Sequence, residues 1–417
     1  MNTHLNMTKK RIQQVIYIGF SSILVVMIMG FLGQSDTNVL DQENKLKYNG
    51  TYGLYVEKTD HYSFHWITES EDVGEYQVLD QSNKVVASGE TKSSRTHAIS
   101  LQKEVKEPFT FKFGGQQAGM NTVNIRKIDK QEKTAYNRVD SLYVVGDVHG
   151  RYDQMSNLLL KANIIDTDLN WIAGKSHVVF LGDVFDRGDD VTKVLWFIYD
   201  LEEKAALAGG KVHLVLGNHE IMTMTKDLRY VSRKERNIAV AHGISYDALF
   251  HPINSHLGTW LRSKVSLLKV GKIVFAHGGI LDLGPISLEE FNNKAYYFMK
   301  DPMYLDVMKQ SPDSTKYNIN SWYEMRYFFY NSEGPYWFRG YVNSDTLALE
   351  LNAMLDKHDS KIHVVAHTTL ETITEKYGGK LLTTDLNDAA TQLLFLIRHR
   401  NKYKRYKIDS EGVKTEL

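Results

Sequence analysis

The stretch SLYVVGDVHG, residues 141–150, decides the fold of this chain because an apolar run leads directly into a polar cluster bounded by glycines. Four later segments repeat this order, and they are HVVFLGDVFDRG (177–188), VHLVLGNHE (212–220), KIVFAHGG (272–279) and KIHVVAHTT (361–369). Short continuous apolar runs are typical of strands buried on both faces. Because longer stretches of helical pattern separate these runs, we predict an α/β domain built from βαβ units.

The clusters that follow the strands contain side chains suited to metal binding. Open α/β sheets bind ligands beyond the carboxyl ends of their strands, so we expect the clusters to meet at one edge. Asp147 and His149 can chelate one cation, and the two oxygens of Asp183 can bridge two. The predicted metal ligands are Asp147, His149, Asp183, Asn218, His277 and His367. Mixed nitrogen and oxygen ligation favours Mn²⁺, Fe or Zn²⁺ over Mg²⁺ or Ca²⁺.

A pair of metal ions of this kind would determine the chemistry. Two ions ~3.5–4 Å apart can bind one bridging hydroxide and direct its in-line attack on phosphorus. Arg187 and Arg339, with Asn218, are the predicted phosphate-binding residues, because guanidinium groups offset the charge on phosphoryl oxygens. His219 is placed to protonate a leaving alkoxide, with Asp186 orienting it. The alternatives are a structural ion pair for Arg339 and a supporting structural role for His219 and Asp186.

The overall composition narrows the choice of partners. The 417 residues include 50 Lys and Arg and 50 Asp and Glu, so the formal charge is zero. Bulk charge therefore gives no support to a nucleic-acid partner, and we predict none. The absence of cysteine excludes disulfides, thiolate metal sites and a cysteine nucleophile. Any metal must be bound by His, Asp, Glu or Asn.

The N-terminal region predicts a membrane location. Residues 12–35 contain no charged side chain and are long enough to cross a ~30 Å hydrocarbon core. Because basic residues precede this stretch, we expect a cytoplasmic stub (1–11), a transmembrane anchor (12–35), a linker (36–47) and an extracytoplasmic, periplasmic catalytic domain. The alternative is a cleaved signal peptide and secretion.

Residues 48–128 form a separate module in this prediction. It contains seven strand-like runs separated by turn residues, and they are 52–58, 62–68, 75–79, 84–88, 97–101, 109–113 and 122–127. Phe109, Phe111 and Phe113 alternate with polar residues, as in a half-buried strand. The number and spacing of the runs favour a small β-sandwich of immunoglobulin or fibronectin type. We find no catalytic cluster in this module. We expect it to act as a spacer, to orient the catalytic domain or to bind a partner.

The series GDVHG, GDVFDRG, GNHE, HGG and a late HT resembles the phosphoprotein phosphatase branch of the calcineurin-like metallophosphoesterases, over about residues 140–385. Within that branch, DLRYVSR (227–233) and GPYWFRG (334–340) resemble the bacterial Shewanella-like protein phosphatases. The resemblance implies a catalytic domain, which we place at 136–408, in which two mixed β-sheets form a sandwich flanked by helices. Phe185 and Ala366 depart from the usual motifs without changing a ligand.

The resemblance also implies roles for individual residues. The first metal would be held by Asp147, His149 and Asp183, and the second by Asp183, Asn218, His277 and His367. His219 would be the proton donor supported by Asp186, and Arg187 and Arg339 would bind the phosphate. We expect a phosphatase that uses two metal ions to hydrolyse phosphomonoesters of proteins or small molecules. Mn²⁺ is the preferred candidate for these ions, and Fe and Zn²⁺ are the alternatives. The alternatives are a phosphodiesterase or pyrophosphatase for nucleotides or lipid-linked phosphates, and a non-catalytic binding protein.

Overall fold

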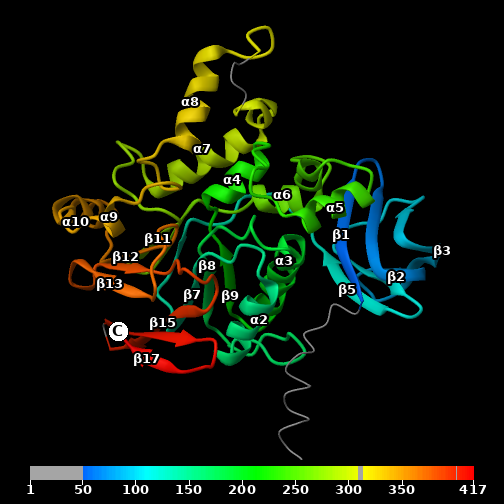
Figure 1. Ribbon diagram of the computed structural model, residues 1–417, viewed down its shortest axis with the longest axis horizontal. Coiled ribbons are helices and arrows are strands. Elements are labelled where there is room, and N and C mark those ends of the chain that lie inside the picture. The colour runs from blue at the N-terminus through cyan, green and yellow to red at the C-terminus, as the bar shows by residue number, and fades with distance from the viewer. Residues whose placement is uncertain (1–49, 309–312, 401) are drawn as a thin grey trace, which may run out of the picture. The chain divides into compact units, whose positions relative to one another are not determined.

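The computed structural model describes residues 50–308, 313–400 and 402–417 (Figure 1). Two six-stranded sheets carry the catalytic region. One has the order β17-β16-β15-β7-β8-β9, and its strands are Ser141–Val145 (β7), His177–Phe180 (β8), Lys211–Leu214 (β9), Gln392–His399 (β15), Lys402–Asp409 (β16) and Lys414–Glu416 (β17). The other has the order β13-β14-β12-β11-β10-β6, and its strands are Ala135–Tyr136 (β6), Leu267–Val270 (β10), Ile273–Ala276 (β11), Ile362–Val365 (β12), Thr374–Lys376 (β13) and Leu381–Thr383 (β14).

The core lies between these two sheets. Leu142 and Val144 of β7 alternate with residues of the opposite face, and both pack in one buried cluster with Phe275 of β11 and Val364 of β12. This interdigitation of two inner faces is the usual arrangement of packed sheets. β7, β8 and β9 pair in parallel, whereas β15 and β16 pair antiparallel, so the sheet is mixed. The expected α/β sandwich of two mixed sheets is confirmed.

The catalytic region also contains nine described helices and three 3₁₀ turns. They are Tyr152–Lys161 (α2), Val191–Leu207 (α3), Asn218–Met224 (α4), Arg233–Ala241 (α5), His256–Arg262 (α6), Leu288–Lys300 (α7), Ile319–Tyr330 (α8), Gly340–Asn343 (α9) and Ala348–Lys357 (α10), with 3₁₀ turns at Tyr246–Phe250 (η1), Pro302–Asp306 (η2) and Tyr377–Gly379 (η3). Their starts follow local sequence. Ser287 caps α7 by accepting from the Glu290 amide, and the Glu290 carboxylate accepts from the Ser287 amide.

The N-terminal module differs from the predicted sandwich of separate sheets. It is one five-stranded antiparallel sheet built from Thr51–Lys58 (β1), Tyr62–Leu79 (β2), Val85–Ser100 (β3), Phe109–Gly115 (β4) and Gly119–Ile125 (β5). Two pairs of predicted strands are merged into β2 and β3, because the polar residues between them continue the ladder through shifts of register.

The long sheet nevertheless encloses its own core. Phe64 of β2 and Phe111 of β4 stack with ring centroids 3.8 Å apart. Phe111 pairs with Val78, which lies 14 residues beyond Phe64 and would be ~46 Å away on a straight strand. The sheet is therefore folded over between these two positions, and the register shifts at 67–75 provide the bend.

Specific hydrogen bonds join the module to the catalytic region. Trp196 of α3 donates its indole N–H to the Leu54 carbonyl over 2.7 Å, and the Tyr199 hydroxyl donates to the Asn124 carbonyl over 2.9 Å. The ring of His242, at the end of α5, bonds the Gly53 carbonyl over 2.7 Å. Side chains of α3 and α5 thus satisfy backbone groups of β1 and β5, and Figure 1 shows α5 beside β1.

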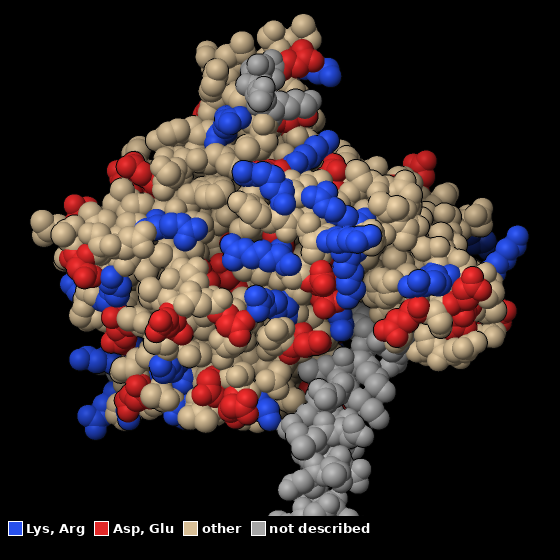
Figure 2. All heavy atoms as spheres, in the orientation of Figure 1, with Lys and Arg blue, Asp and Glu red and all other residues tan. Residues whose placement is uncertain are grey.

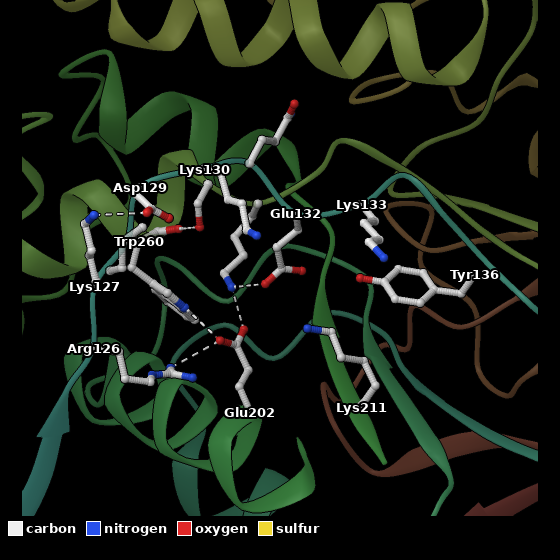
Figure 3. A pocket seen from close by; sticks show the side chains of 14 residues that line it. Arg126, Lys127, Asp129, Lys130, Glu132, Lys133, Tyr136, Glu202, Lys211 and Trp260 are labelled. Carbon is white, nitrogen blue, oxygen red and sulfur yellow. Dashed lines mark hydrogen bonds and ion pairs between the residues drawn. The ribbon is translucent and has the colours of Figure 1, made fainter. Parts of the chain in front are cut away.

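A pocket of about 370 Å³ lies along the segment 126–136 that connects the module to β7 (Figure 3). Lys264 is only 1% exposed there, and its ammonium lies 2.5 Å from Glu132 and 2.6 Å from Glu202. The Trp260 indole N–H also donates to Glu202, over 3.0 Å. Burial opposes ionisation of Glu202, but the charge of Lys264 lowers its pKa below the ordinary value. The buried ammonium is thus paired twice.

The predicted membrane-anchored, extracytoplasmic location is contradicted. Among the described residues, no helix is both long and apolar enough to cross a membrane. The longest of those helices, α3, has 17 residues, which span ~26 Å, and it carries several charged side chains. The stretch 12–35, on which the prediction rested, lies outside the described residues, as do the predicted stub and linker.

Candidate metal centre

The predicted ligands lie on loops that directly follow strands. Asp147 and His149 follow β7, Asp183 follows β8, His277 follows β11 and His367 follows β12. These strands end side by side in the two sheets, so their loops converge.

Two glycines allow two of these loops to touch. Gly182 has a φ of +88°, and a Cβ there would lie 2.6 Å from the Gly217 amide nitrogen. A Cβ on Gly217 would lie 2.4 Å from an oxygen of Asp183. Such distances are far below a van der Waals contact, so only glycine is accommodated at both positions. The approach of the two loops brings Asn218 and His219 next to Asp183.

The structure gathers the ligand atoms into two groups that share Asp183. One contains His149, Asp183 and His219, and the other contains Asp183, His277 and His367, with the ligand atoms of each group within 4.8 Å of one another. Asp183 Oδ2 lies 3.2 Å from His277 Nε2 and 3.7 Å from His219 Nε2. A carboxylate common to two ligand groups is the arrangement needed to bridge two cations.

Asp147 and Asn218 border these groups. An oxygen of Asp147 lies 3.5 Å from His149 Nε2, and the other accepts the His367 amide over 3.3 Å. The Asn218 side-chain oxygen lies 3.0 Å from His277 Nε2. All six predicted ligands are therefore brought together. The one difference from the expected grouping is that His219, predicted as a proton donor, lies in the compact first group where Asp147 was expected.

The histidines are oriented for metal binding. Nδ1 of His149 bonds the Phe185 carbonyl over 2.8 Å, and Nδ1 of His277 bonds the Leu181 carbonyl over 2.7 Å. Since a carbonyl oxygen can only accept, each Nδ1 carries the proton and each Nε2 has a free lone pair when the ring is neutral. Nε2 of His149 and Nε2 of His367 are buried without a hydrogen-bond partner in the described chain. Buried polar atoms are rarely left so, and these two fit metal ligation.

The electrostatics of the centre favour a bound cation. Burial alone would lower the pKa of His277, but the Asp183 carboxylate raises it to about 10. Burial and the neighbouring His277 lower the pKa of His367 to about 3. Burial opposes ionisation of Asp183, but the charge of His277 holds its pKa well below the ordinary value. The Asp183 carboxylate thus stabilises a positive charge next to it, which a bound metal ion would supply.

His219 and Asp186 form the predicted pair. Nδ1 of His219 lies 2.6 Å from Asp186 Oδ2, and both side chains are buried. Asp186 has a φ of +69° and Asp183 a φ of +50°. Backbone strain of this kind in non-glycine residues is typical of functional loops.

The two arginines lie at the exposed side of the centre. The Arg339 guanidinium donates to the His367 carbonyl, and its Nη2 lies 3.5 Å from His367 Nδ1. The described residues include no ion-pair partner for Arg339. Arg187 is exposed, and its amide donates to the Tyr230 carbonyl over 3.0 Å. Tyr230 is 49% exposed, with its ring 5.4 Å from that of His219.

Two acidic residues were missed by the sequence analysis. Glu220 is fully buried, and its carboxylate accepts the amides of Gly217, Asp183 and Val184 over 2.6, 2.9 and 2.7 Å. Glu220 therefore fixes the two touching loops to each other. In the sequence it is the final Glu of the GNHE motif, which could have pointed to it. Asp385 is buried, and burial followed by the nearby Asp147 charge raises its pKa to about 7. No local motif marked Asp385.

With this geometry established, comparisons identify the family. A sequence model described as calcineurin-like phosphoesterase matches residues 141–371, more than half of the chain. The chain belongs to the calcineurin-like phosphoesterase family. Membership in this family confirms the predicted enzyme class, a metal-dependent phosphoric ester hydrolase.

The relatives agree with the narrower resemblance. Shewanella-like protein phosphatase 2 of Arabidopsis thaliana is 38% identical over 102 residues, which cover 24% of this chain and only 26% of that relative. Shewanella-like protein phosphatase 1 of Plasmodium berghei is 27% identical over 279 residues, which cover 63% of this chain and 69% of that relative. The crystal structure of the cold-active protein-tyrosine phosphatase of a psychrophilic Shewanella sp. is 27% identical, with a TM-score of 0.68 over 88% of this chain and 99% of that one. The predicted resemblance to Shewanella-like phosphatases is confirmed.

Proposed function

We propose that this protein is a phosphatase that uses two metal ions to hydrolyse phosphomonoesters carried by proteins. The observation that carries the proposal is the buried Asp183 carboxylate shared by two ligand groups. Asp147, His149 and Asp183 would hold one ion, and Asp183, Asn218, His277 and His367 the other. Mn²⁺ is the expected metal, with Fe and Zn²⁺ as alternatives. Two such ions, when bound, supply Lewis-acid activation of a water nucleophile.

The remaining residues bind the phosphoryl group and move a proton. Arg187 and Arg339 would bind its oxygens together with the Asn218 amide, because both arginine side chains are exposed. Arg187 lies on the loop of Asp183, and the Arg339 guanidinium donates to the His367 carbonyl. His219 would carry a proton on Nε2 and deliver it to the leaving alkoxide. Asp186, 2.6 Å from Nδ1, would stabilise the imidazolium and fix its orientation.

A protein substrate is supported by two observations. Two of the relatives are named protein phosphatases, and the Shewanella enzyme is named a protein-tyrosine phosphatase, whereas other relatives are named symmetrical bis(5'-nucleosyl)-tetraphosphatases. In addition, Arg187, Arg339 and Tyr230, which lie on or contact the loops of the centre, are exposed, as residues that bind a phosphoryl group on a protein surface would have to be.

A substrate panel tests the proposal. Phosphotyrosine peptide, phosphoserine peptide, diadenosine polyphosphate and an aryl phosphodiester are compared with Mn²⁺ supplied. We expect the phosphopeptides to have the highest kcat/KM. Faster turnover of the dinucleotide or the diester would replace the proposal by the nucleotide hydrolase alternative. Less than one bound metal ion per chain, with no turnover of any substrate, would favour a binding protein.

A further inference from the structure

A groove of about 560 Å³ lies between the N-terminal module and α5. Tyr52 and Ile67 form its wall on β1 and β2, and Arg95 with Thr96 extends the wall along β3. The opposite wall is α5, which contributes Arg233, Lys234, Asn237, Ile238 and Ala241. Asp189, from the loop after β8, also lines the groove. The groove therefore needs both the module and the catalytic region.

The groove and the metal centre share the loop between β8 and α3. Asp189 lies two residues beyond Arg187 and six beyond Asp183, so the chain length alone places it within ~22 Å of Asp183. The same loop is tied to α5, because the Lys234 ammonium lies 2.6 Å from Asp190 and the buried Glu235 carboxylate accepts from the Thr192 hydroxyl over 2.6 Å. An extended peptide of about six to seven residues spans the distance from Asp183 to Asp189, which lines the groove.

The lining of the groove is basic. Three cationic side chains face one acidic residue, Asp189, and Lys234 is already paired with Asp190. Arg95 and Arg233 are exposed, and neither has an ion-pair partner among the described residues; Arg95 only donates to the Tyr52 hydroxyl, over 3.4 Å. Figure 2 shows Lys and Arg side chains on this face, over the region where α5 lies beside β1 in Figure 1. Two free guanidinium groups are complementary to carboxylates.

We propose that this groove docks acidic residues that flank the phosphorylated side chain of a protein substrate. The inference rests on the proposed phosphatase function and adds a preference for acidic phosphopeptides. Arg95 and Arg233 would bind the flanking carboxylates while the phosphoryl group occupies the metal centre. The N-terminal module then acts in substrate selection, because it supplies half of the groove.

The test compares two phosphopeptides that differ only in their flanks, one with Asp and Glu within six residues of the phosphorylated residue and one with Asn and Gln there. Steady-state kinetics are measured for the full chain with Mn²⁺, and p-nitrophenyl phosphate serves as a substrate too small to reach the groove. The double variant Arg95→Glu/Arg233→Glu is compared with Lys92→Glu, which changes an exposed β3 residue outside the groove. Glu is tolerated at 233, because an acidic residue is favourable in the first turn of α5.

We expect the wild type to prefer the acidic peptide by about tenfold in kcat/KM, mainly through KM, as two exposed ion pairs would give. The double variant should lose this preference and keep its turnover of p-nitrophenyl phosphate, whereas Lys92→Glu should retain both. Equal use of the two peptides by the wild type, or a preference that persists in the double variant, would overturn the inference.

Failure of the proposed function gives a different result. If the wild type hydrolyses no phosphomonoester, the phosphatase proposal fails first. Fluorescence anisotropy then measures the binding of the same two peptides and tests the docking proposal without requiring turnover. Tighter binding of the acidic peptide, lost in the double variant, supports the groove, and equal binding of the two peptides refutes it.

Discussion

Two of the places where the protein buries ionisable side chains differ in how those side chains are paired. Around Lys264, the ammonium is paired with Glu132 and Glu202, and Glu202 also accepts from Trp260 (Figure 3). At the candidate metal centre, by contrast, the Nε2 atoms of His149 and His367 have no hydrogen-bond partner within the described chain.

The difference separates structural from functional charge. A buried ion is tolerated when its partners satisfy it, and its role is then to hold the surrounding segments in place. Buried polar atoms without partners cost free energy, so they persist where a ligand completes them. The Asp186 oxygen that does not contact His219 is likewise without a partner. Four predictions follow from this contrast, in order of decreasing effect.

The largest effect is expected at the metal centre. Asp147→Asn and His277→Ala should each abolish hydrolysis of a chromogenic aryl phosphate, because each removes a proposed ligand. Bound metal, measured by mass spectrometry, should fall in both. The control is His399→Ala, which removes an exposed histidine far from the ligand groups in sequence and should leave turnover unchanged. Full activity of Asp147→Asn would remove that residue from the ligand set.

The role of His219 is tested next. If His219 donates a proton to the leaving group, its replacement by Gln should lower kcat for phosphoserine peptide by a factor of about 10²–10⁴. The loss should be much smaller for p-nitrophenyl phosphate, whose leaving group needs no proton. Because His219 also lies in the first ligand group, the metal content decides between the two roles. A loss of one ion per chain in His219→Gln would make it a ligand.

The paired cluster predicts an effect on stability. Lys264→Met leaves the partly buried Glu132 without its cation, and it leaves the buried Glu202 with one remaining cationic partner among the described residues, Arg126. The substitution should lower the free energy of unfolding by up to ~3–5 kcal/mol. Adding Glu202→Gln should restore part of this loss, because it removes a buried charge that has lost one of its two cations. Urea unfolding monitored by tryptophan fluorescence measures both, with the exposed Lys92→Met as control. The folded fraction of Lys264→Met should keep the wild-type specific activity.

The smallest effect depends on pH. Burial raises the pKa of Glu235 from an ordinary value of 4.5 to about 7. The folded state therefore binds a proton that the unfolded state has lost, so stability falls as the pH rises from about 4.5 to about 7 and is level above that. Glu235→Gln removes this dependence and should be more stable than wild type by up to ~3 kcal/mol at pH 8, with no difference near pH 4.5. Urea unfolding across this range gives the difference, and a gain independent of pH would contradict the explanation.

Local sequence predicted the catalytic region well for a physical reason. Each buried strand is a short apolar run, and each ligand loop follows it within a few residues, so GDVHG, GDVFDRG and GNHE carry their own geometry. The merging of predicted strands into β2 and β3 was not predictable in the same way. Polar residues at 69–75 match a turn, and only pairing with β3 and β4 keeps them in the sheet.

By itself, the sequence determined the α/β class and the family, and it predicted the side chains of the candidate metal centre, because these depend on patterns a few residues long. The arrangement in two sheets was implied by the resemblance to the family. Tertiary structure alone decided three other features. It placed His219 in the first ligand group, it let Glu220 join two loops, and it brought Arg95 together with Arg233 in one groove. Each of these depends on contacts between segments far apart in the chain, and such contacts form only when the sheets and helices pack.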